Sequence, residues 1–318
     1  MRKRWSICLV LLAVILLFVG CSAPKEAETP QESLPSAVDL DDTGDTSFRP
    51  TLMYMADANG YLVPVMQQIP WEEGIAKATL SQIVVGAESA GAQKAGLTGI
   101  LPKGTKVDLD ISKDGVATVG LSKEALELKD ALAEQNMIAG VVNTLLEFPT
   151  IKSVLIKVDG VTDGKLPHGT SIKEPFTEQK VNLENSQGVD VNTASTVQVY
   201  FQSESGLLVP TTALVDQNPS LTVALTRLTE GPSAAGTLQS VLPEGTQLLD
   251  ASIGEGVAIL NFSKEMASIL DQEDGGAAAA RAVTLTALQF PEVQEVFIRV
   301  EGEALDVQTT VPTFANML

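Results

Sequence analysis

The stretch LPKGTKVDLDISKDGVATVGLSKE (residues 101–124) returns 141 residues later as LPEGTQLLDASIGEGVAILNFSKE (residues 242–265), with ten of 24 positions identical and no gap. A second stretch, FPTIKSVLIKVDG (residues 148–160), returns as FPEVQEVFIRVEG (residues 290–302). Solenoid units recur at roughly 20–50 residues, whereas a period near 140 is the size of a whole small domain. The sequence therefore predicts a tandem domain duplication.

The same order of elements can be predicted in both repeats. Alternating apolar residues with turn signals predict hairpins, helical spacing that ends at Gly or Pro predicts helices, and apolar runs predict the closing strands. The hairpins are expected at 51–65 and 197–210 and again at about 107–122 and 248–263, the first helices at 75–85 and 221–230, the long helices at 126–148 and 276–290, and the closing strands at 154–158 and 296–300.

This β-β-α-β-β-α-β order predicts an α+β fold in which helices cover one face of a mixed sheet. We expect domain one at residues 51–183, a polar linker at 184–195 and domain two at 196–318. Each domain holds a complete copy of the order, so we expect each to fold independently.

The first 20 residues are typical of an export signal, with Arg2, Lys3 and Arg4 before an apolar run at 7–19 that is short for a membrane span. The run ends at Gly20-Cys21, which resembles a bacterial lipobox. We expect Cys21 to carry the lipid; an ordinary secretory signal or a retained anchor is the alternative. Residues 21–50 are acidic and rich in proline and are expected to form a disordered tether.

Charge and composition exclude several classes of function. Residues 1–20 contain three basic and no acidic side chains, so their removal lowers the formal charge from −19 to −22. Such a surface repels nucleic acid and anionic lipid, so the lipid on Cys21 must supply the attachment to the membrane. The other cysteine, Cys8, lies in the signal, which leaves no thiol for a disulfide, a nucleophile or a metal.

A lone histidine, His168, lies in a Pro-His-Gly sequence, and the chain has no other histidine. A catalytic triad or an HExxH zinc site therefore lacks its partners. We interpret His168 as a solvated loop residue.

An acidic segment, Asp108 to Gly115, partly resembles a calcium loop because Asp110, Ser112 and Asp114 alternate before the glycine. The twelfth position, which requires a bidentate Glu, is Leu121. A strand with solvent-facing acids and an Asp-Gly turn is the simpler interpretation, and no metal site is predicted.

The sequence Ser-Lys-Glu recurs at 122–124 and 263–265 and suggests a Ser/Lys nucleophile pair. Adjacent residues do not face each other in a strand or a helix. We therefore predict that Ser122 and Ser263 are helix N-caps, with the acid in the first turn.

Two threonines, Thr144 and Thr286, occupy the same place in the long helices. A buried helical threonine can donate its hydroxyl to the backbone one turn back, so a structural role is predicted.

These motifs together resemble the family of GerM spore germination and sporulation lipoproteins, which contain two GerMN domains. The resemblance covers about residues 51–310 and rests on Leu80/Leu225, Ile83/Leu228, Gly86/Gly231, the LP-x-G-T segments, Thr144/Thr286, Phe148-Pro149/Phe290-Pro291 and the two closing strands. It implies a fold similar to the ring-building motif of sporulation channels, no catalytic residues and no cofactor. It also implies a lipoprotein outside the cytoplasmic membrane that helps an intermembrane channel or platform to assemble, with contact to peptidoglycan as a further expectation.

Two functions remain open from the residues. The first is a non-enzymatic, membrane-anchored assembly factor whose partners are exported sporulation proteins. The second is a lipoprotein that binds or remodels the cell wall, which would need paired carboxylates in a cleft or an aromatic groove. Aromatic residues make up 4% of the chain, which favours the first function.

Overall fold

The computed structural model describes residues 48–72, 74–161, 164–184, 194–233, 236–307 and 314–318. The predicted signal, Cys21 and nearly all of the tether lie outside these residues. Residues Thr46–Leu318 form one compact unit. Within the described part of the chain, no helix has both the length and the apolar character needed to cross a membrane.

Repeat one follows the predicted order, with one additional helix and one short 3₁₀ segment. Its elements are β1 (Phe48–Ala56), β2 (Leu62–Pro70), α1 (Ile75–Gln82), α2 (Ala90–Lys94), β3 (Val107–Ile111), β4 (Val116–Leu121), η1 (Lys123–Leu126), α3 (Ala131–Leu146) and β5 (Ser153–Val158).

Repeat two has the same order, and its first hairpin is directly followed by a single helix. Its elements are β6 (Ser195–Gln202), β7 (Leu208–Val215), α4 (Leu221–Thr229), β8 (Leu248–Gly254), β9 (Val257–Phe262), η2 (Lys264–Asp271), α5 (Ala277–Leu288), β10 (Glu295–Val300) and β11 (Glu303–Ala304).

The strands of each repeat divide between two sheets. The first hairpin, β1–β2 or β6–β7, is a two-stranded sheet by itself. The other strands form a mixed sheet, in which β4 pairs antiparallel with β3 and parallel with β5, and β9 pairs antiparallel with β8 and parallel with β10. The α+β class and the mixed sheet are confirmed.

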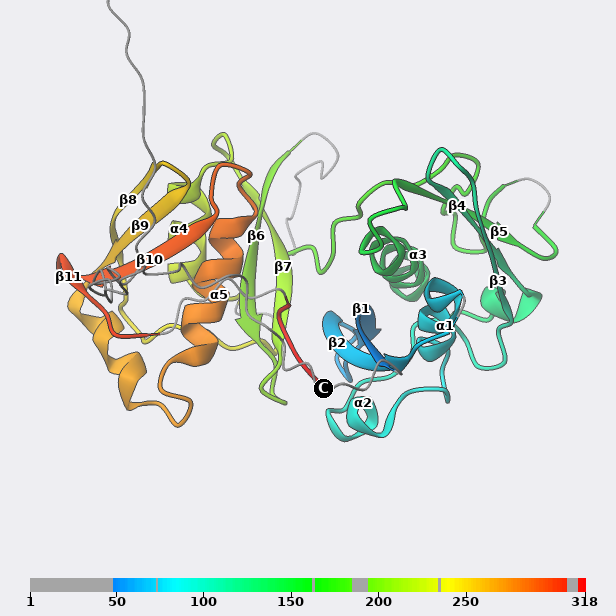
Figure 1. Ribbon diagram of the computed structural model, residues 1–318, viewed down its shortest axis with the longest axis horizontal. Helices are drawn as coiled ribbons and strands as arrows, with labels where there is room; N and C mark the ends of the chain where they lie inside the picture. Colours follow the sequence, from blue (N-terminus) through cyan, green and yellow to red (C-terminus); the bar gives the residue numbers. More distant parts are fainter. Residues whose placement is uncertain (1–47, 73, 162–163, 185–193, 234–235, 308–313) are drawn as a thin grey trace, which may run out of the picture. The chain divides into compact units, whose positions relative to one another are not determined.

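Helices α1 and α3 of repeat one and helices α4 and α5 of repeat two lie between the hairpin and the mixed sheet of their repeat, as Figure 1 shows for α4 and α5. The central strands of the mixed sheets alternate, so that one face is buried against the helices: Ala117, Val119 and Leu121 in β4, and Ala258, Leu260 and Phe262 in β9. The helices thus cover one face of each mixed sheet, as predicted.

The long helix of repeat one begins later than predicted, at Ala131 instead of residue 126. Asp130 is its N-cap, and its carboxylate accepts the N–H of Ala133 at 2.8 Å. The residues before it form the 3₁₀ segment η1. The prediction began too early because apolar Leu126 and Leu128 continue the helical spacing, whereas the Asp130 cap determines where the helix starts.

The two repeats differ in the segment after their first helix. Repeat one has twelve residues from Gly86 to Leu97, which include α2, and repeat two has eight from Gly231 to Leu238. These ends correspond, because Thr98 pairs with Ala56 just as the residue after Leu238 pairs with Gln202. Repeat two is therefore four residues shorter beside its hairpin.

Candidate functional site at the seam between the repeats

The second strands of the two hairpins, β2 and β7, pack against each other. Both contain the sequence Leu-Val-Pro, at 62–64 and 208–210. Proline has no N–H, so neither strand can offer a continuous row of donors to the other. The free carbonyls need other donors. We call β2, β7 and the residues 181–184 and 315–318 that contact them the seam.

Asn182, in the tail of repeat one, supplies one set of partners. Its Oδ1 accepts the N–H of Leu62 at 2.8 Å, and its Nδ2 donates to the carbonyls of Leu62 and Pro210, both at 2.7 Å. Its φ of 49° is left-handed, a conformation that asparagine tolerates better than most residues. One side chain thus joins the two repeats.

Asn316, in the tail of repeat two, makes the equivalent set of hydrogen bonds. Its Oδ1 accepts the N–H of Leu208 at 2.8 Å, and its Nδ2 donates to the carbonyls of Leu208 at 2.8 Å and Pro64 at 2.9 Å. The two asparagines therefore relate the repeats by an approximate two-fold symmetry.

The backbones of the two tails follow the same symmetry. The carbonyl of each bridging asparagine accepts an N–H from the second strand of the other repeat, Thr212 in β7 at 3.3 Å and Met66 in β2 at 2.8 Å. Glu184 then donates its N–H to Thr212, and Leu318 donates its N–H to Met66, each at 3.0 Å. Each repeat thus completes the sheet edge of the other.

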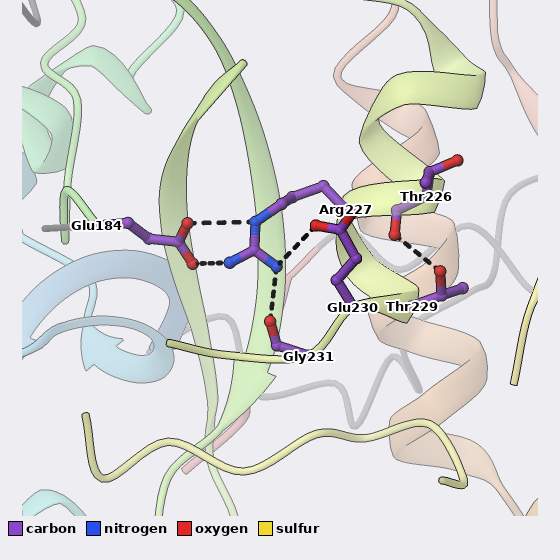
Figure 2. A network of polar contacts seen from close by, with 6 residues as sticks. All are labelled: Glu184, Thr226, Arg227, Thr229, Glu230 and Gly231. Carbon is purple, nitrogen blue, oxygen red and sulfur yellow. Dashed lines mark hydrogen bonds and ion pairs between the residues drawn. The ribbon is translucent and has the colours of Figure 1, made fainter. Parts of the chain in front are cut away.

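An ion pair adds to the seam on the side of repeat two. The guanidinium of Arg227 in α4 binds both carboxylate oxygens of Glu184, with Nε 3.2 Å from Oε2, and its Nη1 donates to the carbonyl of Gly231 at 2.6 Å (Figure 2). The same guanidinium lies 5.6 Å from the ring centre of Phe201. Both charged side chains are only 15% exposed. The pair fastens residue 184 to α4 in a bidentate geometry.

A cavity of about 190 Å³ lies beside this ion pair. It is lined by Tyr61, Asn182, Leu183, Glu184, Phe201, Thr211, Pro232, Ser233, Gly236 and Leu238. The seam therefore contains buried polar contacts and a hollow on the side of repeat two.

The Ser-Lys-Glu segments are structural, although not in the way predicted. Ser122 and Ser263 occupy the N-cap positions of η1 and η2, but neither hydroxyl caps the segment. Each accepts a backbone N–H 16 residues earlier in the chain and donates to the Glu two residues later, at 2.5 Å for Glu124 and 2.6 Å for Glu265. These bonds lower the pKa of both carboxyls.

The acidic segment of repeat one is not gathered around a point. Asp108 lies on β3 and contacts the ammonium of Lys77 at 2.9 Å, while the Ser112 hydroxyl accepts the N–H of Val116. Gly115 has a φ of 88° in the predicted turn. Among the described residues, no group of three or more His, Cys, Asp or Glu side chains could hold a metal ion.

His168 is an exposed turn residue, as predicted, and it also contacts the rest of the repeat. Its ring Nε2 is 3.1 Å from the carbonyl of Leu128, and its N–H donates to the buried carboxylate of Glu134 at 2.7 Å. Burial raises the pKa of Glu134, but hydrogen bonds from Thr170 and His168 outweigh it, and the pKa is lowered. The residues thus fix the turn onto α3.

The two threonines at the same place in the long helices, Thr144 and Thr286, make different contacts. The Thr144 hydroxyl accepts the N–H of Tyr54 at 3.0 Å and thereby joins α3 to β1. The Thr286 hydroxyl is buried and has no partner among the described residues. In repeat two the side chain of Gln289 instead binds the N–H and carbonyl of Gln198, at 2.9 and 2.8 Å.

Sequence reasoning missed the seam. Asn182 falls near the end of the predicted domain one (51–183), and neither Asn182 nor Asn316 was singled out. A signal was present: Val-Asn-Leu at 181–183 and Ala-Asn-Met at 315–317 are a second, weaker repeat with an offset of 134. Independent folding of the two domains stays a prediction.

The family model described as "Germane: Sporulation and spore germination" matches residues 52–164 and 198–306, well over half of the chain. The chain belongs to the Germane family. Its two matched segments coincide with the two repeats, which identifies each repeat as one family domain.

A curated relative and a solved structure agree with this assignment. The spore germination protein GerM of Bacillus subtilis (strain 168) is 27% identical over 293 residues, which cover 89% of this chain and 78% of that protein. The solved tandem GerMN domains of the sporulation protein GerM from Bacillus subtilis match with a TM-score of 0.72 and 26% identity, covering 85% of this chain and 99% of that one. The suspected family and the tandem fold are confirmed, and the names of these matches refer to sporulation and germination.

Proposed function

We propose that this protein is a non-enzymatic assembly factor of the cell envelope in sporulation or germination. It would be anchored through lipid on Cys21 to the outer face of the cytoplasmic membrane, where it would bind exported sporulation proteins and assist assembly of an intermembrane channel or platform. The family assignment supports the process, and the seam supports the mode of action. No cofactor or metal is part of this proposal.

The observation that carries the proposal is the reciprocal bridging of the repeats by Asn182 and Asn316. Two modules that complete each other's sheet edges can present two binding surfaces as one unit. Such a pair gains from effective concentration, because the second contact with a partner becomes intramolecular.

Each mixed sheet keeps one edge strand, β3 or β8, that has no neighbouring strand on its outer side within the described residues. The opposite edges are covered: Phe176 pairs with β5 at Val154, and β11 pairs with β10. Ile111 on β3 and Ile253 on β8 are 41% and 37% exposed at equivalent places, and both strands carry aspartates. These edges suit an added strand from a partner with basic side chains.

The anchor and the partner are tested separately. A Cys21→Ala variant in sporulating cells should leave the membrane fraction; a variant that stays membrane-bound and unprocessed would identify residues 1–20 as a retained anchor.

For the partner, an Ile111→Lys/Ile253→Lys double variant should lose crosslinks to exported proteins that the Cys21-bearing parent forms. A matched double variant, Leu132→Lys/Leu270→Lys, changes exposed leucines away from the edges and should keep them. Retention on purified cell wall with unchanged crosslinking would favour the wall-binding alternative, and release of muropeptides would refute a non-enzymatic role.

A further inference from the structure

The cavity in the seam is accessible and has a polar atom that nothing satisfies. Ser233 and Gly236 in its lining are exposed, so it is open to solvent on that side. Thr211 is 4% exposed, and its Oγ1 has no hydrogen-bond partner among the described residues. Its neighbour Thr212, by contrast, donates its hydroxyl to the carbonyl of Val181 at 2.8 Å. A buried hydroxyl without a partner is unfavourable, so the Thr211 hydroxyl in the cavity wall is a candidate contact for a ligand.

Repeat one provides an internal comparison at the equivalent place of its first hairpin. Alignment of Leu-Val-Pro-Val at 62–65 with Leu-Val-Pro-Thr at 208–211 makes Val65 the equivalent of Thr211. Val65 and Ala92 of α2 are fully buried in one apolar core, and Leu318 packs against the same core and lies 3.7 Å from a Cβ placed at Gly91. The loop of repeat two that is four residues shorter is the counterpart in sequence of the segment that contains α2 in repeat one. The cavity thus coincides with a deletion and with a change from valine to threonine.

The chemistry of the wall limits what can bind. Phe201 lies on the same face of the hairpin as Thr211, since Thr211 pairs with Val199. Tyr61 and Leu238 add an aromatic and an apolar side chain. The carboxylate of Glu184 is neutralised by Arg227 but keeps lone pairs that can accept a donor from a ligand. The walls therefore suit a neutral ring that carries one hydroxyl group.

We propose that this cavity binds a neutral phenolic ring, with the ring between Phe201, Tyr61 and Leu238 and its hydroxyl bonded to Thr211 and Glu184. The size agrees, because a cavity of about 150 Å³ in another protein holds benzene. A free phenolic molecule and a tyrosine side chain share this chemistry. The site adds a ligand to the proposed assembly function and does not depend on it.

The test is a titration of the purified protein with phenol, toluene and benzoate, followed by NMR or calorimetry. Phenol should saturate a single site, toluene should bind more weakly because it leaves Thr211 unpaired, and benzoate should not bind because its charge is not compensated. N-acetyltyrosinamide distinguishes the sources: binding as tight as that of phenol identifies a tyrosine site, and its exclusion identifies a site for free small molecules.

Thr211→Val, which installs the residue of repeat one, should weaken phenol binding about three- to tenfold and leave toluene unchanged, as expected for one lost hydrogen bond. Thr237→Val, at an exposed residue outside the lining, is the control and should change neither. Leu238→Trp should fill the cavity and abolish phenol binding while cooperative unfolding is retained. Phenol binding that does not saturate, or that Thr211→Val leaves unchanged, overturns the proposal.

Discussion

Repeat one and repeat two share an order of elements, yet they meet the seam differently. On the side of repeat one, Val65, Ala92 of α2 and Leu318 belong to one apolar cluster. On the side of repeat two, the equivalent space holds a cavity, the unpaired hydroxyl of Thr211 and the ion pair of Arg227 with Glu184. One duplicated fold has thus produced a packed half and a polar half, and the polar half is where a ligand can act.

The loops next to the seam show the same contrast. In repeat one the Glu88 carboxylate accepts the N–H groups of Gly86 and Gly99 at 3.0 and 2.8 Å and the hydroxyl of Thr98 at 3.1 Å. These bonds lower the pKa of Glu88 against the opposing effect of its burial. Sequence alignment places Ser233, an exposed residue, at this position in repeat two. In repeat one the Glu88 carboxylate thus holds its loop by hydrogen bonds, whereas its counterpart in repeat two, Ser233, is an exposed residue of the cavity lining.

The largest expected effect breaks what the two halves share. Asn316→Ala removes three hydrogen bonds and leaves buried groups of Leu208 and Pro64 without partners, so the free energy of unfolding should fall by about 3 kcal/mol. Asn182→Ala should cost less, because Asn182 is only half-buried. Urea unfolding measures both, with exposed Asn59→Ala as the control that should change little. Equal losses for Asn316 and Asn59 would show that the seam contributes no stability.

The next effect is confined to the polar half. Arg227→Ala removes the partner of Glu184, whose side chain is 15% exposed in the intact protein. The free energy of unfolding should fall by about 2 kcal/mol, because a largely buried carboxylate is left unpaired. The comparison pair is Lys77–Asp108, whose side chains are 49% and 84% exposed. Lys77→Ala should therefore cost less than about 0.5 kcal/mol and become negligible in 1 M salt. If both losses vanish in salt, the Arg227 pair behaves as a surface pair and the contrast between the halves is wrong.

A smaller pair of effects should have opposite signs. Thr211→Val removes an unpaired buried hydroxyl and should raise the free energy of unfolding by about 1 kcal/mol. Val65→Thr introduces one into the packed half and should lower it by about 1–2 kcal/mol. Thermal and urea unfolding of the two variants decide the matter. A loss of stability in both would mean that the two spaces are equally well packed.

The smallest effect depends on pH. Burial, followed by the nearby carboxylate of Glu178, raises the pKa of Glu147, which occupies the place of Gln289 in repeat two. A raised pKa in the folded state means that the stability from this group is present at acid pH and is lost as the pH rises through the folded pKa. Glu147→Gln should therefore be slightly more stable than the parent at pH 7 and equal to it at pH 4; the difference at pH 7 should be small because Glu147 is exposed and solvent screens its charge. A difference that does not change with pH would exclude titration of Glu147 as the cause.

The sequence by itself determined the duplication, the α+β class and most element positions, because these depend on local periodicity and on turn residues. Gly115, for example, acts within a few residues of itself, and the turn that it forms can be predicted from the chain. The family resemblance could be identified for the same reason. Cys21 and its lipid remain predictions of the sequence.

Only the tertiary structure decided the seam. Asn182 bonds to Leu62 over 120 residues and Asn316 bonds to Pro64 over 252, and no local pattern specifies which distant carbonyl an amide will meet. The cavity required even more, since it arises from a shorter loop, one threonine and a tail that belongs to the other repeat. Those parts are brought together by long-range packing, and packing depends on the whole fold instead of on neighbours in the chain.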